Sequence, residues 1–135
     1  MTATSDRPAA TERRTAISIV LWVAARLPGF GIGIAGLAKF YASARWDRLF
    51  LSWGYPTWLS KVTGAIEVAG AILLFVPRTT GYGALILAVT MLAAFLTLVT
   101  HRGGLLGWGA TPLTYFMWLC ALVIVRWKKG PALHQ

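Results

Sequence analysis

Glu67 is the side chain in this sequence that is best placed to do chemistry. It lies in the stretch TGAIEVAGAILLFVP, Thr63 to Pro77, where every other residue is small or apolar. A lone carboxylate in such a span is costly, so it must pair with a cation, take up a proton or bind a ligand. Arg26 lies in an earlier apolar run and is the cation we expect beside it. The pair could fix one helix against another, or line a polar pocket for a ligand or a proton. The sequence leaves both interpretations open.

Lys39 and His101 are two further polar groups at the ends of apolar runs. With Tyr55 and Trp58 they could form the mouth of a pocket whose floor is Glu67. The alternative for Lys39 is a side chain that extends to the lipid headgroups, and for His101 a cation that suits the end of a helix.

Several kinds of chemistry have no support in the sequence. Cys120 is the single cysteine, so neither an intrachain disulfide nor a dithiol pair can form. His101 and His134 are far apart in the chain, and we expect no metal site. The formal charge of +9 comes from basic residues that flank apolar runs. This pattern suits an anionic lipid surface, and we expect no nucleic-acid partner.

The elements that carry these residues are predicted to be membrane-spanning helices. The 135 residues are 57% hydrophobic and 13% charged, with a mean hydropathy of +0.65, whereas soluble domains have about a quarter charged residues. Four apolar runs approach the roughly 20 residues that cross a bilayer. We therefore predict an all-α, transmembrane four-helix bundle, with spans at about 16–40, 57–76, 80–101 and 113–127. The single membrane domain would cover 16–127, between a disordered polar tail at 1–15 and a basic tail at 128–135.

A short amphipathic helix is predicted between spans one and two. Its apolar stripe consists of Trp46, Leu49, Phe50 and Trp53, which follow helical spacing. Such a helix could cap the end of the bundle at the interface, or form a lid over a pocket.

The depth of the charged residues within their spans and the spacing of small residues predict how the spans contact one another. Glu67 and Arg26 both lie near the middle of their predicted spans, so antiparallel helices would bring them together. Small residues that recur every four positions predict close helix contacts in lipid. They are Ala25, Gly29 and Gly33 on span one, Ala65 and Ala69 on span two, and Ala84 and Ala88 on span three.

Basic residues predict the orientation of the four spans. Those expected on the side of the termini are Arg7, Arg13, Arg14, Arg78, Arg126, Lys128 and Lys129, against Lys39, Arg45, Arg48, Lys61 and Arg102 on the other side. This bias favours cytoplasmic termini in a plasma membrane. A signal peptide ending near Ala25 is an alternative, but the apolar run continues past Arg26.

These features resemble the DoxX family of small four-helix membrane proteins. The resemblance covers about Val23 to His101 and rests on the arginine of the first span, GLAK at 36–39, the Gly54-Tyr55-Pro56 turn and GAIE at 64–67 with Gly70. It implies that Arg26, Lys39, Glu67 and His101 are the polar positions of the family. Family members resemble accessory membrane subunits: one branch is linked to a thiosulfate:quinone oxidoreductase, another to an oxidative-stress complex, and distant relatives are chaperones of membrane proteins.

The resemblance implies an accessory subunit of a quinone-linked or redox-stress complex in a bacterial-type inner membrane. The alternative is a membrane scaffold or chaperone. We expect no catalytic residues and no activity of the chain alone, because electron transfer needs a redox cofactor. A quinone or another lipophile is the ligand that a greasy slot with a few donors would take. Partners would be the lipid bilayer and a redox enzyme or other membrane protein, with a homo-oligomer as a further alternative.

Overall fold

Long helices dominate the computed structural model, which describes residues 6–102 and 110–129. Within these ranges the helices are α1 (Asp6–Tyr41), α2 (Ser43–Ser52), α3 (Thr57–Phe75), α4 (Thr80–Arg102) and α5 (Ala110–Lys129). All but α2 are long and apolar enough to cross a membrane. The prediction of an all-α protein with four membrane spans is confirmed.

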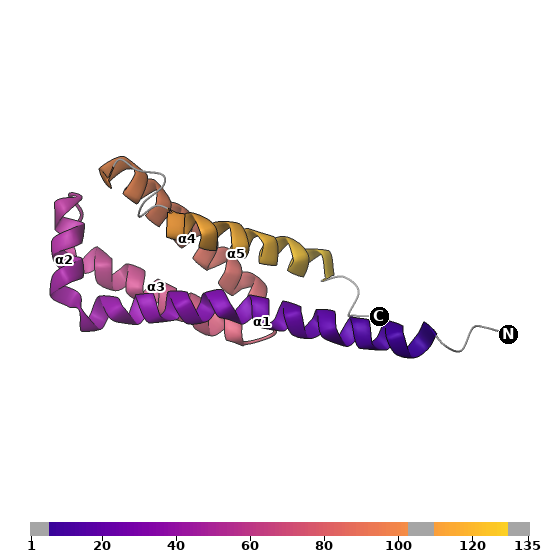
Figure 1. The fold of residues 1–135 in the computed structure, drawn as a ribbon. Coiled ribbons are helices and arrows are strands. Elements are labelled where there is room, and N and C mark those ends of the chain that lie inside the picture. Colours follow the sequence, from indigo (N-terminus) through magenta and orange to yellow (C-terminus); the bar gives the residue numbers. More distant parts are fainter. Residues whose placement is uncertain (1–5, 103–109, 130–135) are drawn as a thin grey trace.

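The long helices form a bundle in which consecutive spans are neighbours (Figure 1). α1 packs along α3, α3 along α4, and α4 along α5, while α1 touches α5 over a shorter stretch. α2 lies across one end of the bundle and contacts α3 and α1. The start of α1 and the end of α5 lie at the opposite end, where α1 extends past the other helices (Figure 1).

The spans differ from the predicted boundaries mainly at the N-terminal side. α1 begins at Asp6, so residues 6–15 are helical, whereas a disordered tail was expected over 1–15. The fourth span was predicted at 113–127 and is longer, from Ala110 to Lys129. Residues 1–5 and most of the predicted basic tail, 130–135, lie outside the described residues.

The turns follow from glycine and proline. Gly54 has a φ of +79°, a left-handed conformation that glycine adopts without strain, and it connects α2 to α3 just before Pro56. α3 ends at Phe75, before Pro77, which cannot continue a helix. Pro28, in contrast, lies inside α1, and the helix continues past it.

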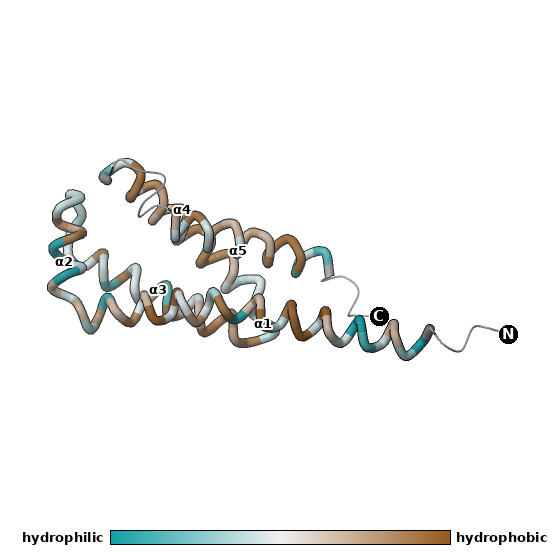
Figure 2. Tube along the Cα trace, in the orientation of Figure 1, coloured by the Kyte–Doolittle hydropathy of each residue, from teal (hydrophilic) through white to brown (hydrophobic). Residues whose placement is uncertain are grey.

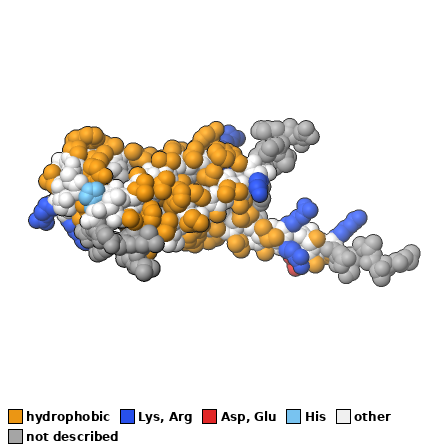
Figure 3. All heavy atoms as spheres, turned by 90° about the horizontal axis from the view of Figure 1, so that it is seen from above, with side chains coloured by type: hydrophobic (Ala, Val, Ile, Leu, Met, Phe, Trp, Pro, Cys, Tyr) orange, Lys and Arg blue, Asp and Glu red, His pale blue; other side chains and the backbone are white. Residues whose placement is uncertain are grey.

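A narrow apolar core runs along the bundle axis. Ile32, Leu74, Leu87 and Leu119 are almost completely buried in it, one from each long helix. Apolar residues dominate the long helices, and hydrophilic residues are prominent at the start of α1, in α2 and at the end of α5 (Figure 2). Apolar side chains also cover the outside of the bundle, and the Lys and Arg side chains gather at its two ends (Figure 3). Such a surface fits a lipid environment.

Glycines set the closest helix contacts. A Cβ added to Gly36 would lie 2.9 Å from the Gly64 carbonyl oxygen, and one added to Gly83 would lie 2.8 Å from the Gly70 carbonyl oxygen. α1 therefore crosses α3, and α3 crosses α4, at distances that only glycine allows.

The predicted small-residue faces are only partly correct. On α1, Ala25 is buried, and Gly29 and Gly33 face Leu74 and Ala71. Ala84 and Ala88 are buried as expected. The face predicted from Ala65 and Ala69 is wrong, because both are exposed. On α3 the contact runs instead through the buried residues Gly64, Gly70 and Ala71.

Candidate functional site

A buried ion pair joins α1 to α3. Lys39 Nζ donates a hydrogen bond to Glu67 Oε2 at 2.5 Å. The two residues are only 5% and 3% exposed. Glu67 thus has a partner, as its apolar surroundings require, and that partner is Lys39.

The glycine crossing between α1 and α3 positions this pair. A Cβ on Gly36 would lie 3.0 Å from Glu67 Cβ, and one on Gly64 would lie 3.1 Å from Lys39 Cβ. The absence of side chains at both glycines lets the two backbones approach, so Lys39 reaches Glu67 across a short gap. The ammonium also lies 4.7 Å from the ring centroid of Trp46, on α2, in cation–π contact.

Arg26 is far from Glu67, so the predicted Arg26–Glu67 pair is wrong. Its guanidinium donates to the carbonyl oxygens of Trp22, at 3.1 Å, and Phe75, at 3.4 Å. Phe75 is about 12 Å along α3 from Glu67. The register of the glycine crossing explains the error. It aligns Glu67 with the segment from Gly36 to Lys39, whereas the prediction measured depth from an assumed start of span one at residue 16.

His101 lies at the end of α4 among aromatic side chains. Its ring centroid is 6.0 Å from that of Tyr55 and 6.3 Å from that of Trp53. Nδ1 lies 3.0 Å from the Thr97 carbonyl oxygen. The expected neighbourhood of His101 and Tyr55 is thus present, while Lys39 is turned toward Glu67. Trp58, which was expected near them, is 61% exposed.

A second ion pair, which the sequence interpretation missed, joins α2 to α3. Lys61 Nζ donates to Asp47 Oδ1. Ser60, which is fully buried, donates to the same oxygen at 2.8 Å. The hydrogen bond from Lys61, followed by that from Ser60, lowers the pKa of the Asp47 carboxyl group. The signal for this pair was present, because Asp47 and Lys61 flank the Gly54–Pro56 turn, which folds α2 back onto α3.

The apolar stripe of α2 faces the bundle. Phe50 is buried, and Trp46, Leu49 and Trp53 are partly buried. The Phe50 ring lies 5.6 Å from that of Trp53 and 6.2 Å from that of Tyr55. Arg45 and Arg48 on other faces of α2 are exposed. The predicted amphipathic helix is present, and its stripe covers one end of the bundle.

This arrangement can hold charge and donate hydrogen bonds inside a membrane. Lys39 has a donor group next to an aromatic face, and Glu67 is the carboxylate that accepts from it. Over the described ranges, no three His, Cys, Asp or Glu side chains come together as metal ligands would. Cys120 is partly buried in α5.

Comparison of the sequence with known protein families gives a match. The model of the DoxX-like family matches residues 23–125, which include Arg26, Lys39, Glu67 and His101. No curated protein and no solved structure matches the chain.

Proposed function

This chain belongs to the DoxX-like family, and from that membership we propose that it is an accessory subunit of a quinone-linked or redox-stress membrane complex. The observation that carries the proposal is the buried ion pair of Lys39 and Glu67. Family resemblance supplies the type of complex, and the pair supplies the candidate site.

The cost of the pair supports a functional role. Each ionised side chain inside a bilayer is penalised by about 3 kcal/mol on insertion scales, and two apolar residues of similar volume often replace a buried pair without loss of stability. A bundle that needs only packing would gain little from this pair. Charged side chains within spans are accordingly associated with ligand and proton pathways.

A quinone is the ligand class that fits these groups. It is flat and apolar, and its carbonyl oxygens accept hydrogen bonds, so it needs an apolar slot with one or two donors. Lys39 is the best donor, because its side chain is buried and its ammonium lies beside the Trp46 ring. Glu67 accepts a hydrogen bond from the same ammonium and so fixes its position. Electrons would come from a partner enzyme that carries the redox cofactor.

The alternative function is a scaffold or chaperone for another membrane protein. The glycine crossing favours it, because the ion pair lies directly beside Gly36 and Gly64 and could fix the register of α1 against α3. In that case the pair belongs to the architecture, and the binding surface lies elsewhere on the bundle.

Native mass spectrometry of the chain extracted from its own membrane in mild detergent separates the two functions. An organic extract of the same sample is analysed for bound lipophiles. We expect a stoichiometric quinone or a redox-enzyme partner. Finding only phospholipid, or a non-redox membrane protein, would contradict the accessory role and favour the scaffold.

A double-substitution cycle then tests the ion pair itself. Lys39→Gln and Glu67→Gln each leave one buried charge without its partner, so we expect each to lower accumulation, with a stability loss of about 3–5 kcal/mol. The double variant removes both charges, and we expect its accumulation to recover.

The amount of bound quinone distinguishes the two roles of the pair. If Lys39 is a ligand donor, the double variant accumulates but carries no quinone. If it carries as much quinone as the unmodified chain, the pair is architectural. Asp47→Asn with Lys61→Gln is the matched control, because it neutralises an ion pair at the end of the bundle and should leave the bound quinone unchanged.

The proposed location is a bacterial-type plasma membrane with both termini in the cytoplasm. An even number of spans brings both ends of the chain to one side. Basic residues are more numerous at that side, as the positive-inside rule requires of a cytoplasmic face.

A further inference from the structure

Three arginines line one groove at the end of the bundle opposite α2. They are Arg14 and Arg26 on α1 and Arg126 on α5, and the groove has a volume of about 360 Å³. No acidic residue lines it. In the described part of the chain, the two salt bridges are those of Glu67 and Asp47, which involve none of these arginines.

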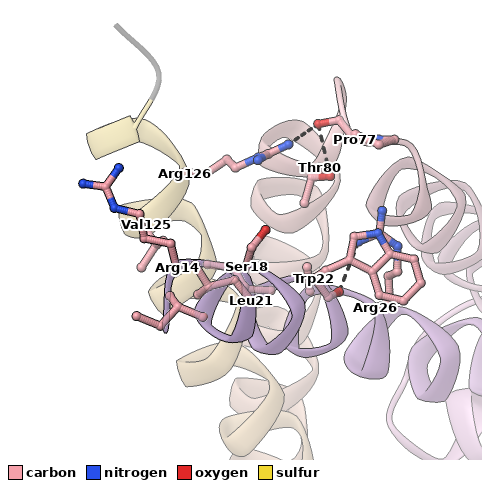
Figure 4. A pocket seen from close by; sticks show the side chains of 12 residues that line it. Arg14, Ser18, Leu21, Trp22, Arg26, Pro77, Thr80, Val125 and Arg126 are labelled. Carbon is pink, nitrogen blue, oxygen red and sulfur yellow. Dashed lines mark hydrogen bonds between the residues drawn. The ribbon is translucent and has the colours of Figure 1, made fainter. Parts of the chain in front are cut away.

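The arginines have donors to spare. Arg26 donates to the carbonyl oxygens of Trp22 and Phe75, and Arg126 donates to the carbonyl oxygen of Pro77. The bonds to Phe75 and Pro77 satisfy carbonyl groups at and beyond the end of α3, and this is the purely structural role of the two arginines. A guanidinium carries more N–H groups than these bonds use, and the remaining ones can donate to an anion. Figure 4 shows Arg126 and Arg26 on opposite sides of the groove.

Apolar side chains form much of the wall of the groove, and its aromatic residue, Trp22, indicates that it lies at the depth of the lipid headgroups. Ile17, Leu21 and Leu122 line it together with the arginines. Trp22 is 58% exposed, and the Arg26 guanidinium lies 3.9 Å from its ring centroid. Exposed tryptophans are typical of the level where lipid headgroups meet acyl chains.

From this combination we infer that the groove binds an anionic phospholipid of the surrounding leaflet. The headgroup phosphate would accept hydrogen bonds from the arginines, which bind phosphate oxygens through paired N–H donors. An acyl chain would lie along the apolar wall between α1 and α5. A soluble phosphate would match the charge but would leave that wall empty.

The groove is separate from the proposed ligand site. Arg26 and Lys39 are about 20 Å apart along α1. Arg14 and Arg126 also lie outside residues 23–125, the part of the chain that the family model matches. The lipid site therefore combines one arginine within the family match with two beyond it, and it does not depend on the function of Lys39 and Glu67.

Lipid titration of the full chain, followed by native mass spectrometry in mild detergent, tests the inference. The probes are phosphatidylglycerol, phosphatidylcholine and inorganic phosphate. We expect one phosphatidylglycerol to bind at least about five-fold more tightly than phosphatidylcholine, since each basic residue near an anionic surface contributes about that factor. Inorganic phosphate at the same concentration should neither bind nor displace the lipid.

Arg14→Gln is the decisive variant. No side-chain hydrogen bond of Arg14 is present within the described residues, so its removal should leave the fold intact. We expect a loss of about five-fold in phosphatidylglycerol affinity and no change for phosphatidylcholine. Arg13→Gln is the matched control, because Arg13 is exposed on the same turn of α1 and does not line the groove.

Arg126→Lys adds a test of geometry, because lysine keeps the positive charge but lacks the planar guanidinium with its paired N–H donors. We expect this variant to lower the affinity for phosphatidylglycerol as well. The inference is overturned if the two lipids bind with equal affinity or if inorganic phosphate displaces the lipid. It is also overturned if Arg13→Gln lowers the affinity for phosphatidylglycerol as much as Arg14→Gln does.

Discussion

At the scale of single residues, Asp47 gives the protein a stability that depends on pH. Its folded-state pKa is lowered by the hydrogen bonds from Lys61 and Ser60. The stabilisation is therefore fully present above the unfolded-state pKa of about 4 and is lost as the pH falls through the lower folded-state value. We expect the melting temperature in detergent to fall as the pH is lowered below about 4, and Asp47→Asn to reduce that fall. An Asp47→Asn profile that runs parallel to the unmodified one would contradict this role.

The same scale shows what the sequence could predict of the candidate site. That Glu67 needs a partner follows from its apolar neighbours alone, and the residues singled out included the true partner, Lys39. The choice between Lys39 and Arg26 depends on the register of α1 against α3. Register is set by which glycines face each other across the helices, and a single sequence does not contain that pairing.

At the scale of elements, the crossing of α1 and α3 depends on Gly36. A methyl group there would meet the Gly64 carbonyl oxygen and Glu67 Cβ, neither of which can move without shifting a helix. Overpacking of this kind costs about 1–3 kcal/mol, against a gain of about 1 kcal/mol in helix propensity. We expect Gly36→Ala to lower the stability in detergent by up to about 2 kcal/mol and to weaken the contact of Lys39 with Glu67.

Gly81→Ala is the matched control for this prediction. A Cβ at Gly81 would meet its nearest neighbour, Arg126 Cγ, at 3.7 Å, which is an ordinary contact. The same substitution should therefore leave the stability unchanged or raise it slightly. Equal losses at Gly36 and Gly81 in thermal unfolding would show that the close crossing is not what requires glycine.

The positions of the helices were predictable where the length and hydropathy of an apolar run determine them. Apolar runs of sufficient length located all four spans, and the predicted end of the second span at residue 76 lies one residue past the end of α3 at Phe75. The start of α1 was missed, because residues 6–15 are polar and a helix there needs no apolar face. The prediction that Ala65 and Ala69 form a helix contact was wrong for another reason. A helix in lipid carries small residues on several sides, and spacing alone does not say which side meets a neighbour.

At the scale of the whole molecule, the polar groups lie at three levels along an apolar bundle. The arginine groove is at one end, the ion pair of Lys39 and Glu67 lies inside, and Asp47, Lys61 and His101 are at the end that α2 covers. Apolar side chains cover the surface between the ends (Figure 3). The orientation of the bundle in the membrane thus decides which leaflet each charged group faces.

Cysteine labelling in intact cells tests that orientation. In a Cys120→Ser background, Arg7→Cys and Arg48→Cys place one exposed thiol at each end of the bundle. Because basic residues are retained on the cytoplasmic side, we expect a membrane-impermeant maleimide to label Arg48→Cys in intact cells and Arg7→Cys only after permeabilisation. The background without cysteine should stay unlabelled in both conditions. Labelling of Arg7→Cys alone in intact cells would show that the bundle has the opposite orientation. The arginine groove would then face the lipids of the outer leaflet.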